Sequence, residues 1–193
     1  MEPLPDIAAQ KKALRGAYIA NRDAMDRGER SRRTARLVER LVALPQYRDA
    51  RSVLATMSIG SEWSTRAFLE GARAAGKSIV LPRVVKNPSR LEIHVVGDLD
   101  RDLVPGVWDI PEPDPARCPR VSLADVDFAW VPALAVDAER FRLGYGAGYF
   151  DALLAGRGAK PYCVCALPAQ FHVARLPHDS HDVPVDLTLS DAP

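Results

Sequence analysis

The feature that most restricts the fold is an alternation, beyond Arg51, of short apolar runs with segments of helical periodicity. The runs at 52–57 and 78–82 flank a helical segment at 65–75, and the three segments together form a β-α-β pattern. Further apolar runs, and one short helix, are predicted within 127–136 and at 149–154, 161–167 and 185–189. Strands that are apolar on both faces are typical of a parallel sheet. The sequence therefore predicts an α/β fold with a mostly parallel sheet sandwiched between helices.

Two central segments depart from this alternation. Residues 91–96 alternate polar and apolar side chains and predict a half-exposed strand, reached through a turn at Asn87-Pro88. Five prolines between 105 and 119 exclude a regular helix or a central strand, so we expect a long ordered loop. Trp108 in this loop either stacks on a flat ring or anchors the loop to the protein body.

The N-terminal quarter carries a local excess of positive charge. Residues 1–51 hold 12 basic and 7 acidic side chains, whereas the remainder holds 14 and 18, for a net charge of +1. Helices are predicted at 6–25 and 32–44, each with a basic face opposite an apolar one. The near balance excludes general attraction to nucleic acid but leaves room for a local anion site.

Length and composition predict one cytoplasmic domain. A chain of 193 residues without a visible linker or repeat forms one domain, here 1–193. The first ten residues lack a basic segment followed by an apolar one, and no apolar run is long enough to span a membrane. Cys118, Cys163 and Cys165 form an odd set without Cys-x-x-Cys spacing, which indicates buried reduced thiols.

The most specific motif is the run RLGYGAGYFD at 142–151, between a predicted strand and a predicted helix. Its alternating glycines let the backbone approach a ligand and turn its N–H groups inward, and the helix start adds a positive dipole end. Phosphate fits such a loop, with charge from Arg142 and a Mg²⁺ held by Asp151. The spacing matches neither the dinucleotide fingerprint nor a Walker loop, and a tight turn without a ligand is the alternative.

A second candidate is the polar segment PHDSHDVPVD at 177–186, which precedes the last predicted strand. Its histidines do not have the spacing of a zinc site. A carboxylate that supplies one oxygen to a hydrated Mg²⁺ fits better, and Asp182 is the residue we select. Capping of a turn is the alternative role for this side chain.

Lys11 and Arg15 lie four positions apart on the first predicted helix, so both cations project from one side and could hold a polyphosphate. Solvation of an exposed helix face is the alternative. Glu62 follows the first predicted strand, where α/β proteins place ligand contacts. Its carboxylate could accept hydrogen bonds from an amino-substituted heterocycle, or it could simply stand near a helix start at Ser64 or Thr65.

Other classes of protein lack their motifs here. The sequence has no Gly-x-Ser-x-Gly element of a serine hydrolase, and its cysteines have no nucleophile context. Basic residues do not alternate with aromatic ones as in single-strand nucleic-acid binders.

Five elements, in this order, resemble the 5-formyltetrahydrofolate cyclo-ligase family, also called methenyltetrahydrofolate synthetase. They are Lys11-x-x-x-Arg15, Ser58-x-x-x-Glu62, GVWDIPEP at 106–113, RLGYGAGYFD and HDVPVD at 181–186. The resemblance implies a three-layer α/β/α sandwich similar to the sugar-phosphate isomerase and CoA-transferase group. It also implies an ATP- and Mg²⁺-dependent cyclisation of 5-formyltetrahydrofolate to 5,10-methenyltetrahydrofolate, with release of ADP and phosphate, through a phosphorylated formyl imidate.

The resemblance also assigns roles to individual residues. Asp151 and Asp182 would bind Mg²⁺. The folate would contact Met57, Glu62, Trp108 and Tyr149. The nucleotide would contact Lys11, Arg15, Arg142, Leu143, Gly144, Tyr145, Gly146, Ala147, Gly148, Tyr149 and Phe150. Ala147, Phe150 and Trp63 depart from the residues common in the family.

The expected partners are therefore ATP and 5-formyltetrahydrofolate, with or without a polyglutamate tail, and neither nucleic acid nor membrane. We expect a monomer. Two other functions stay open on the sequence: a family paralogue that binds nucleotide or folate without catalysis, and a sugar-phosphate isomerase on a related fold.

Overall fold

The computed structural model describes residues 6–192, so the segment expected to lack a leader lies partly outside it. The main sheet has seven strands in the order β12-β10-β7-β1-β2-β3-β6. Their bounds are β1 (Ser52–Leu54), β2 (Ser78–Lys86), β3 (Ser89–Val96), β6 (Arg120–Val121), β7 (Phe128–Trp130), β10 (Tyr162–Ala166) and β12 (Leu187–Leu189). Neighbours from β12 to β2 pair in parallel, whereas β3 pairs antiparallel with β2 and β6. The predicted mostly parallel sheet and the turn at Asn87-Pro88 are thus confirmed.

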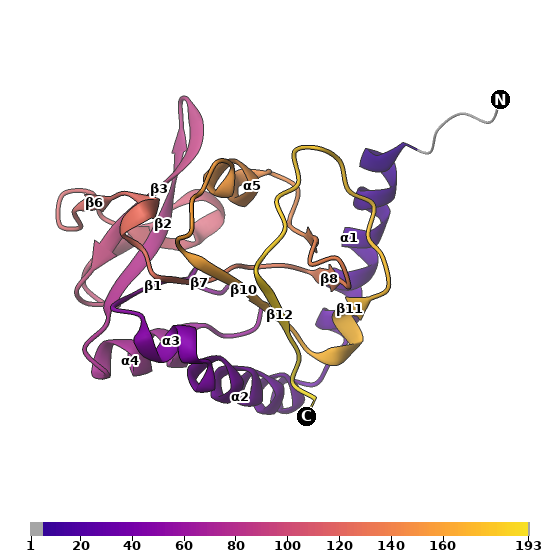
Figure 1. The fold of residues 1–193 in the computed structure, drawn as a ribbon, viewed down its shortest axis with the longest axis horizontal. Coiled ribbons are helices and arrows are strands. Elements are labelled where there is room, and N and C mark those ends of the chain that lie inside the picture. The colour runs from indigo at the N-terminus through magenta and orange to yellow at the C-terminus, as the bar shows by residue number, and fades with distance from the viewer. Residues whose placement is uncertain (1–5, 193) are drawn as a thin grey trace.

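Five α-helices accompany the sheet: α1 (Ile7–Asp23), α2 (Arg27–Ala43), α3 (Pro45–Asp49), α4 (Arg66–Ala74) and α5 (Tyr149–Leu154). Helices α2, α3 and α4 lie on one side of the sheet and α5 on the other (Figure 1). Helix α2 begins five residues before the predicted start because the Asp26 carboxylate caps it, accepting from the Glu29 amide at 3.0 Å. The short helix α3 was not predicted from the sequence.

The main core packs α2, α3 and α4 against the sheet and also includes Leu154 of α5. Strand β1 is buried on both faces, with Val53 and Leu54 inaccessible to solvent. Phe68 of α4 meets Trp130 of β7 edge-to-face, with ring centroids 5.4 Å apart. These apolar contacts fix the orientation of the parallel strands, and therefore of the loops that leave their carboxyl ends.

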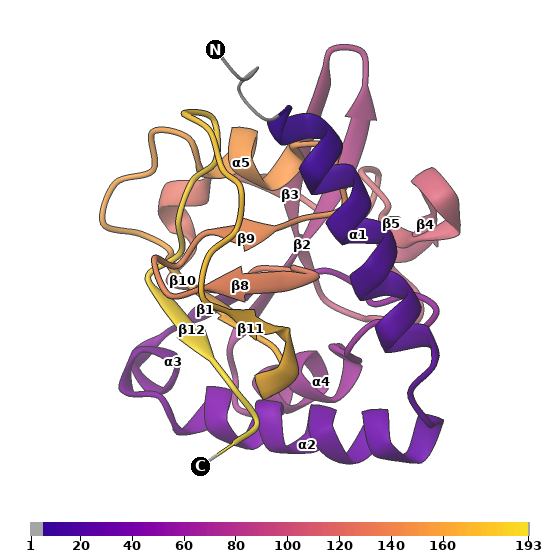
Figure 2. The same cartoon turned by 90° about the vertical axis from the view of Figure 1, so that its right-hand side faces the viewer.

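Two smaller sheets complete the fold. One is β11-β8-β9, built from β8 (Ala135–Asp137), β9 (Arg142–Leu143) and β11 (His172–Val173). Leu14 and Tyr18 of α1 pack against the small apolar cluster that this sheet supports, and Figure 2 shows α1 beside β8 and β9. Helix α1 is thus held next to the strand that leads into the glycine-rich run.

The other small sheet lies in the proline-rich segment, where a loop alone was expected. Strands β4 (Leu103–Pro105) and β5 (Pro111–Pro113) form a two-stranded antiparallel ribbon, with a 3₁₀ turn at Val107–Asp109 between them. The prolines are accommodated because the ribbon is not part of the main sheet. Further 3₁₀ turns occupy Leu123–Asp125 and Ala169–Phe171.

The three cysteines are free and buried, as expected. Burial raises the pKa of the Cys163 thiol to about 11 and that of the Cys165 thiol to about 12. Both side chains therefore remain neutral thiols at physiological pH. Within residues 6–192, no helix combines the length and the apolar character needed to cross a membrane.

Candidate active site

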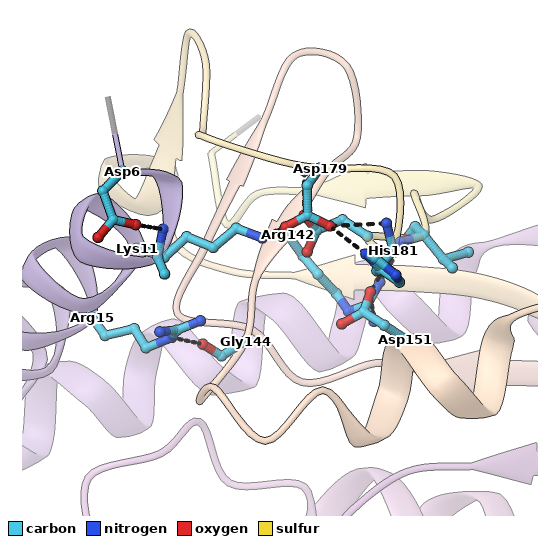
Figure 3. Close-up of polar contacts among 11 residues, drawn as sticks. Asp6, Lys11, Arg15, Arg142, Gly144, Asp151, Asp179 and His181 are labelled. Carbon is cyan, nitrogen blue, oxygen red and sulfur yellow. Dashed lines mark hydrogen bonds and ion pairs between the residues drawn. The ribbon is translucent and has the colours of Figure 1, made fainter. Parts of the chain in front are cut away.

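The glycine-rich loop connects β9 to α5. Gly146 and Gly148 have φ angles of +109° and +69°, a backbone region that side chains rarely adopt, which explains glycine at both positions. A Cβ at Gly146 would also lie 3.2 Å from Cζ of Arg15. The Arg15 Nε donates to the carbonyl oxygen of Gly144 at 2.9 Å, so a cation of helix α1 contacts this loop directly (Figure 3).

Lys11, one turn before Arg15, reaches a second loop. Its ammonium donates to the Asp182 carboxylate and, at 3.3 Å, to Asp179 Oδ2. The backbone amide of His181 and the Lys11 ammonium hold the pKa of Asp179 below its usual value. Figure 3 shows Lys11 and Arg15 extending from α1 toward these two loops. The predicted basic pair therefore faces other segments of the chain instead of open solvent.

Arg142 occupies a different place from the one its predicted role suggests. Its side chain is 2% exposed, its Nη2 donates to Asp151 Oδ1 at 2.9 Å, and its Nη1 donates to the Val183 carbonyl. Charge and hydrogen bonds of this guanidinium are thus already used inside the protein. Contact of Arg142 with a phosphate stays a prediction.

The two candidate Mg²⁺ ligands, Asp151 and Asp182, both lie next to Val183. Asp151 Oδ1 accepts from the Val183 amide at 3.0 Å, and Asp182 is the residue before Val183. Asp182 Oδ2 accepts from Lys11 and from the Asp179 amide. In the described part of the chain the second oxygen of each carboxylate accepts no hydrogen bond, and no group of three or more His, Cys, Asp or Glu side chains could hold a metal. One or two carboxylates with several waters are the usual ligands of Mg²⁺, so binding of that ion by Asp151 and Asp182 stays a prediction.

A pocket opens at the carboxyl ends of β1, β7 and β10, where parallel-sheet proteins bind ligands. It is lined by residues that include Thr56, Glu62, Trp130, Ala133, Tyr145 and Leu167. Glu62 belongs to the loop after β1, where its Oε2 accepts from the Ile59 amide at 3.0 Å. The structure thereby places Glu62 and Tyr145 of the glycine loop in one pocket, whereas the family resemblance assigned them to different substrates.

Sequence reasoning missed Arg22, which connects these two loops. This residue of α1 is 6% exposed; its Nη1 donates to the Tyr145 hydroxyl at 2.6 Å and its Nε to Ser61 Oγ at 3.0 Å. Partial burial and the nearby Glu62 carboxylate raise the pKa of the Tyr145 phenol, although 44% of the residue is exposed, and Arg22 has the opposite effect. Its spacing from Lys11 and Arg15 along one helix was the signal available, because positions eleven apart lie three turns along the same face.

The remaining predicted residues are spread around this region. Met57 is half-buried and packs on the core, as does Phe150. The Tyr149 hydroxyl accepts from Ser89 Oγ at 3.2 Å, at the tip of the β2–β3 hairpin. Leu143 is buried in the cluster beneath α1, Ala147 is exposed, and the Trp108 side chain projects from the β4–β5 ribbon with 66% of the residue exposed.

Comparisons with known proteins identify the family of the chain. The model of the 5-formyltetrahydrofolate cyclo-ligase family matches residues 7–190. The chain is 25% identical to the 5-formyltetrahydrofolate cyclo-ligase of Mus musculus over 196 residues, 97% of each chain. It is 28% identical to the enzyme of that name from Mycolicibacterium smegmatis, over 90% of this chain and 89% of the other.

Solved structures give the same result. The 5,10-methenyltetrahydrofolate synthetase of Aquifex aeolicus superimposes with a TM-score of 0.82 at 30% identity, covering 95% of this chain and 90% of that one. The Mycoplasma pneumoniae 5,10-methenyltetrahydrofolate synthetase, at 20% identity and a TM-score of 0.72, shares the fold over 94% of this chain and 99% of its own. Because the family model spans the sheet, the glycine loop and both acidic residues beside Val183, the chain belongs to the 5-formyltetrahydrofolate cyclo-ligase family, a family of ligases.

Proposed function

We propose that this protein cyclises 5-formyltetrahydrofolate to 5,10-methenyltetrahydrofolate and uses ATP to drive the reaction. The observation that carries the proposal, beside family membership, is the convergence of three segments far apart in the sequence. Lys11 and Arg15 of α1 meet the glycine loop on one side and the Asp179–Asp182 turn on the other. Cations, backbone amides and carboxylates are the groups that phosphoryl transfer requires.

The nucleotide would bind at the glycine loop. Arg15 lies against Gly144 and Gly146, where backbone N–H groups and a helix start favour phosphate oxygens. Lys11 stands between this loop and Asp182, so it can neutralise phosphate charge once the ligand competes for its ammonium. Asp151 and Asp182 would hold Mg²⁺, which neutralises charge on the transferring phosphate.

The folate would bind in the pocket that contains Glu62. A carboxylate in a low-dielectric pocket accepts strong hydrogen bonds from the amino and N–H groups of a pterin ring. Arg22 and Tyr145 hold this carboxylate's loop against the glycine loop. Met57 and Trp108 would supply apolar and stacking contacts. This arrangement would bring the formyl group close to the terminal phosphate, and proximity is the main source of rate in such transfers.

The reaction balances without a protein nucleophile. The formyl oxygen of the folate attacks the γ-phosphorus, the bond from the γ-phosphorus to the bridging oxygen breaks, and ADP leaves. N10 then attacks the activated formyl carbon, the carbon–oxygen bond breaks, and phosphate departs as N10 loses its proton. The protein's own residues therefore need only position the two substrates and neutralise the charge on the transferring phosphate.

Product absorbance tests the proposal directly. Purified protein with 5-formyltetrahydrofolate, ATP and Mg²⁺ should form 5,10-methenyltetrahydrofolate, and omission of either ATP or Mg²⁺ should abolish the signal. Binding of both ligands without product would instead identify a non-catalytic paralogue. Activity on a sugar phosphate without ATP would contradict the proposal.

We further propose that the protein works as a cytoplasmic monomer, that it binds neither nucleic acid nor membrane, and that its folate substrate can carry a polyglutamate tail. Sedimentation measures the oligomeric state. Comparison of mono- and polyglutamylated substrates measures the last.

A further inference from the structure

The turn between β4 and β5 presents a tryptophan in an unfavourable backbone conformation. Trp108 has φ 57° and ψ 30°, and Asp109 follows with φ 59°, so two consecutive residues with side chains occupy the left-handed region. Trp108 is 66% exposed, whereas Trp63 and Trp130 are 6% and 4% exposed. A strained turn that exposes a large apolar ring persists only where its surroundings impose it.

The side chain of Glu112 lies inside this turn. Glu112 lies in β5, is 3% exposed, and its Oε1 accepts from the Val107 amide at 3.3 Å. A Cβ on Gly106 would lie only 2.1 Å from Glu112 Cδ, so the carboxylate occupies the space that the missing side chain of Gly106 leaves free. Backbone hydrogen bonds from Gly106 N to Ile110 O at 2.8 Å and from Ile110 N to Val107 O at 3.2 Å close the turn around it.

Burial of a carboxylate in this space costs free energy, because the charge loses its hydration. Its nearest cation is Arg83, whose Nη1 is 3.9 Å from Glu112 Oε2 and donates at 2.9 Å to the Pro113 carbonyl. An apolar side chain could pack against Gly106 without the desolvation of a charge. An acceptor aimed at the Val107 amide does what an apolar side chain cannot, because it fixes the backbone directly before Trp108.

We propose that Glu112 is a positioning residue for folate binding, which holds the turn so that the Trp108 ring faces outward to stack on the flat ring of the substrate. The inference rests on the proposed function for its substrate. Its structural part, the control of Trp108 by Glu112, is independent of that function.

Tryptophan fluorescence tests the structural part. Trp108 is the exposed member of the three tryptophans, which all lie in the described part of the chain, so acrylamide quenching reports chiefly on it. Glu112→Ala should change the quenching constant clearly, whereas Glu112→Gln, which keeps an oxygen for the Val107 amide, should leave it near the wild-type value. Equal quenching in wild type and Glu112→Ala would overturn the inference.

Steady-state kinetics test the functional part. Glu112→Ala should raise KM for 5-formyltetrahydrofolate roughly tenfold, as expected for loss of one aromatic contact, with little change in kcat or in KM for ATP. Trp108→Ala should give the same pattern, and Glu112→Gln should rescue it. An unchanged KM in Trp108→Ala or Glu112→Ala contradicts the proposal, provided that the wild type forms product; an inactive wild type would reject the proposed function instead, while quenching still tests the control of Trp108.

A double variant separates positioning from packing. Gly106→Ala alone forces its new methyl group into Glu112 and should lower the melting temperature. Combining Gly106→Ala with Glu112→Ala removes that clash, so the melting temperature should return to that of Glu112→Ala. The folate KM should nevertheless stay high, because no carboxylate holds the Val107 amide. A wild-type KM in the double variant would show that only packing matters and would refute the positioning role.

Discussion

Helices α1 and α2 are both 17 residues long and both carry a basic face, yet they have opposite roles. Helix α2 inserts Leu37 and Leu41 into the core with no solvent exposure, and Arg33 of its basic face pairs with Glu29 and Asp191. The one buried residue of α1 is a cation, Arg22. A similar amphipathic pattern thus supports the core in one helix and delivers charge to the site in the other.

The largest expected effect concerns a cation of α1. Arg15→Met keeps an unbranched side chain but removes the guanidinium group beside Gly144, and we expect kcat/KM to fall about 10²–10³-fold, as when one transition-state donor is lost. The free energy of unfolding should change by less than about 1 kcal/mol, since the side chain is not in the core. Turnover assays and denaturant titrations measure the two quantities. A normal rate would remove α1 from the active site.

The reciprocal change in α2 should act on stability. Leu41→Ala deletes a side chain that is fully buried and should cost about 2–5 kcal/mol of unfolding free energy. At a temperature where the variant remains folded, its kcat/KM should match that of the wild type. A large loss of turnover with little loss of stability would contradict the division of roles between the helices.

An intermediate effect is expected where α1 connects the two loops. Tyr145→Phe removes the hydroxyl that accepts from Arg22 at 2.6 Å. Hydrogen bonds to charged groups contribute about 1.5–3 kcal/mol, so kcat/KM should fall at least about tenfold as the two loops lose their alignment. Tyr18→Phe is the control. Tyr18 also lies on α1 but packs against the small apolar cluster, so loss of its hydroxyl should leave the rate unchanged.

Acid should loosen the attachment of α1. The His181 amide and the Lys11 ammonium lower the pKa of Asp179 in the folded protein. The stability from this carboxylate is therefore complete above its ordinary pKa and is lost as the pH falls through the lower, folded value. Hydrogen-exchange protection factors in α1 should decrease as the pH is lowered toward 3. Unchanged protection of α1 over this range would mean that the Lys11 contact with Asp179 does not anchor the helix.

The smallest effect is expected for an exposed arginine of α2, which serves as the matched control for Arg15. Arg36→Met should change the unfolding free energy by no more than about 0.5 kcal/mol and leave kcat/KM unaltered. The same assays measure it. A substantial loss of activity would show that the basic face of α2 also takes part in binding.

Much of the fold could be predicted because it depends on local patterns. The apolar runs at 78–82 and 161–167 were recognised as strands of a parallel sheet, and both are strands of the main sheet. Helix α3 was missed, since five residues give too little periodicity. The β4–β5 ribbon was missed because prolines argue against strands, although an edge ribbon tolerates them.

The candidate site divides in the same way. The glycine loop, Lys11, Arg15 and Glu62 stand out by residue type and spacing alone. The internal pairing of Arg142 with Asp151, and the contact of Arg22 with Tyr145, could not be read from the sequence. An arginine's charge is visible in a sequence, but its partner and its burial are not.

The fold class, the alternating-glycine motif and the family resemblance can be read from the residues in order, because periodicity, glycine spacing and motif order are local or linear properties. Which cations lie at the candidate site and which are paired inside the protein depends on how the helices pack. Those contacts join residues from 39 positions apart, for Arg22 and Ser61, to 171 positions apart, for Lys11 and Asp182. The physical reason is that the packing of α1 on the small sheet, and of α2 on the core, sets the direction in which each basic face points.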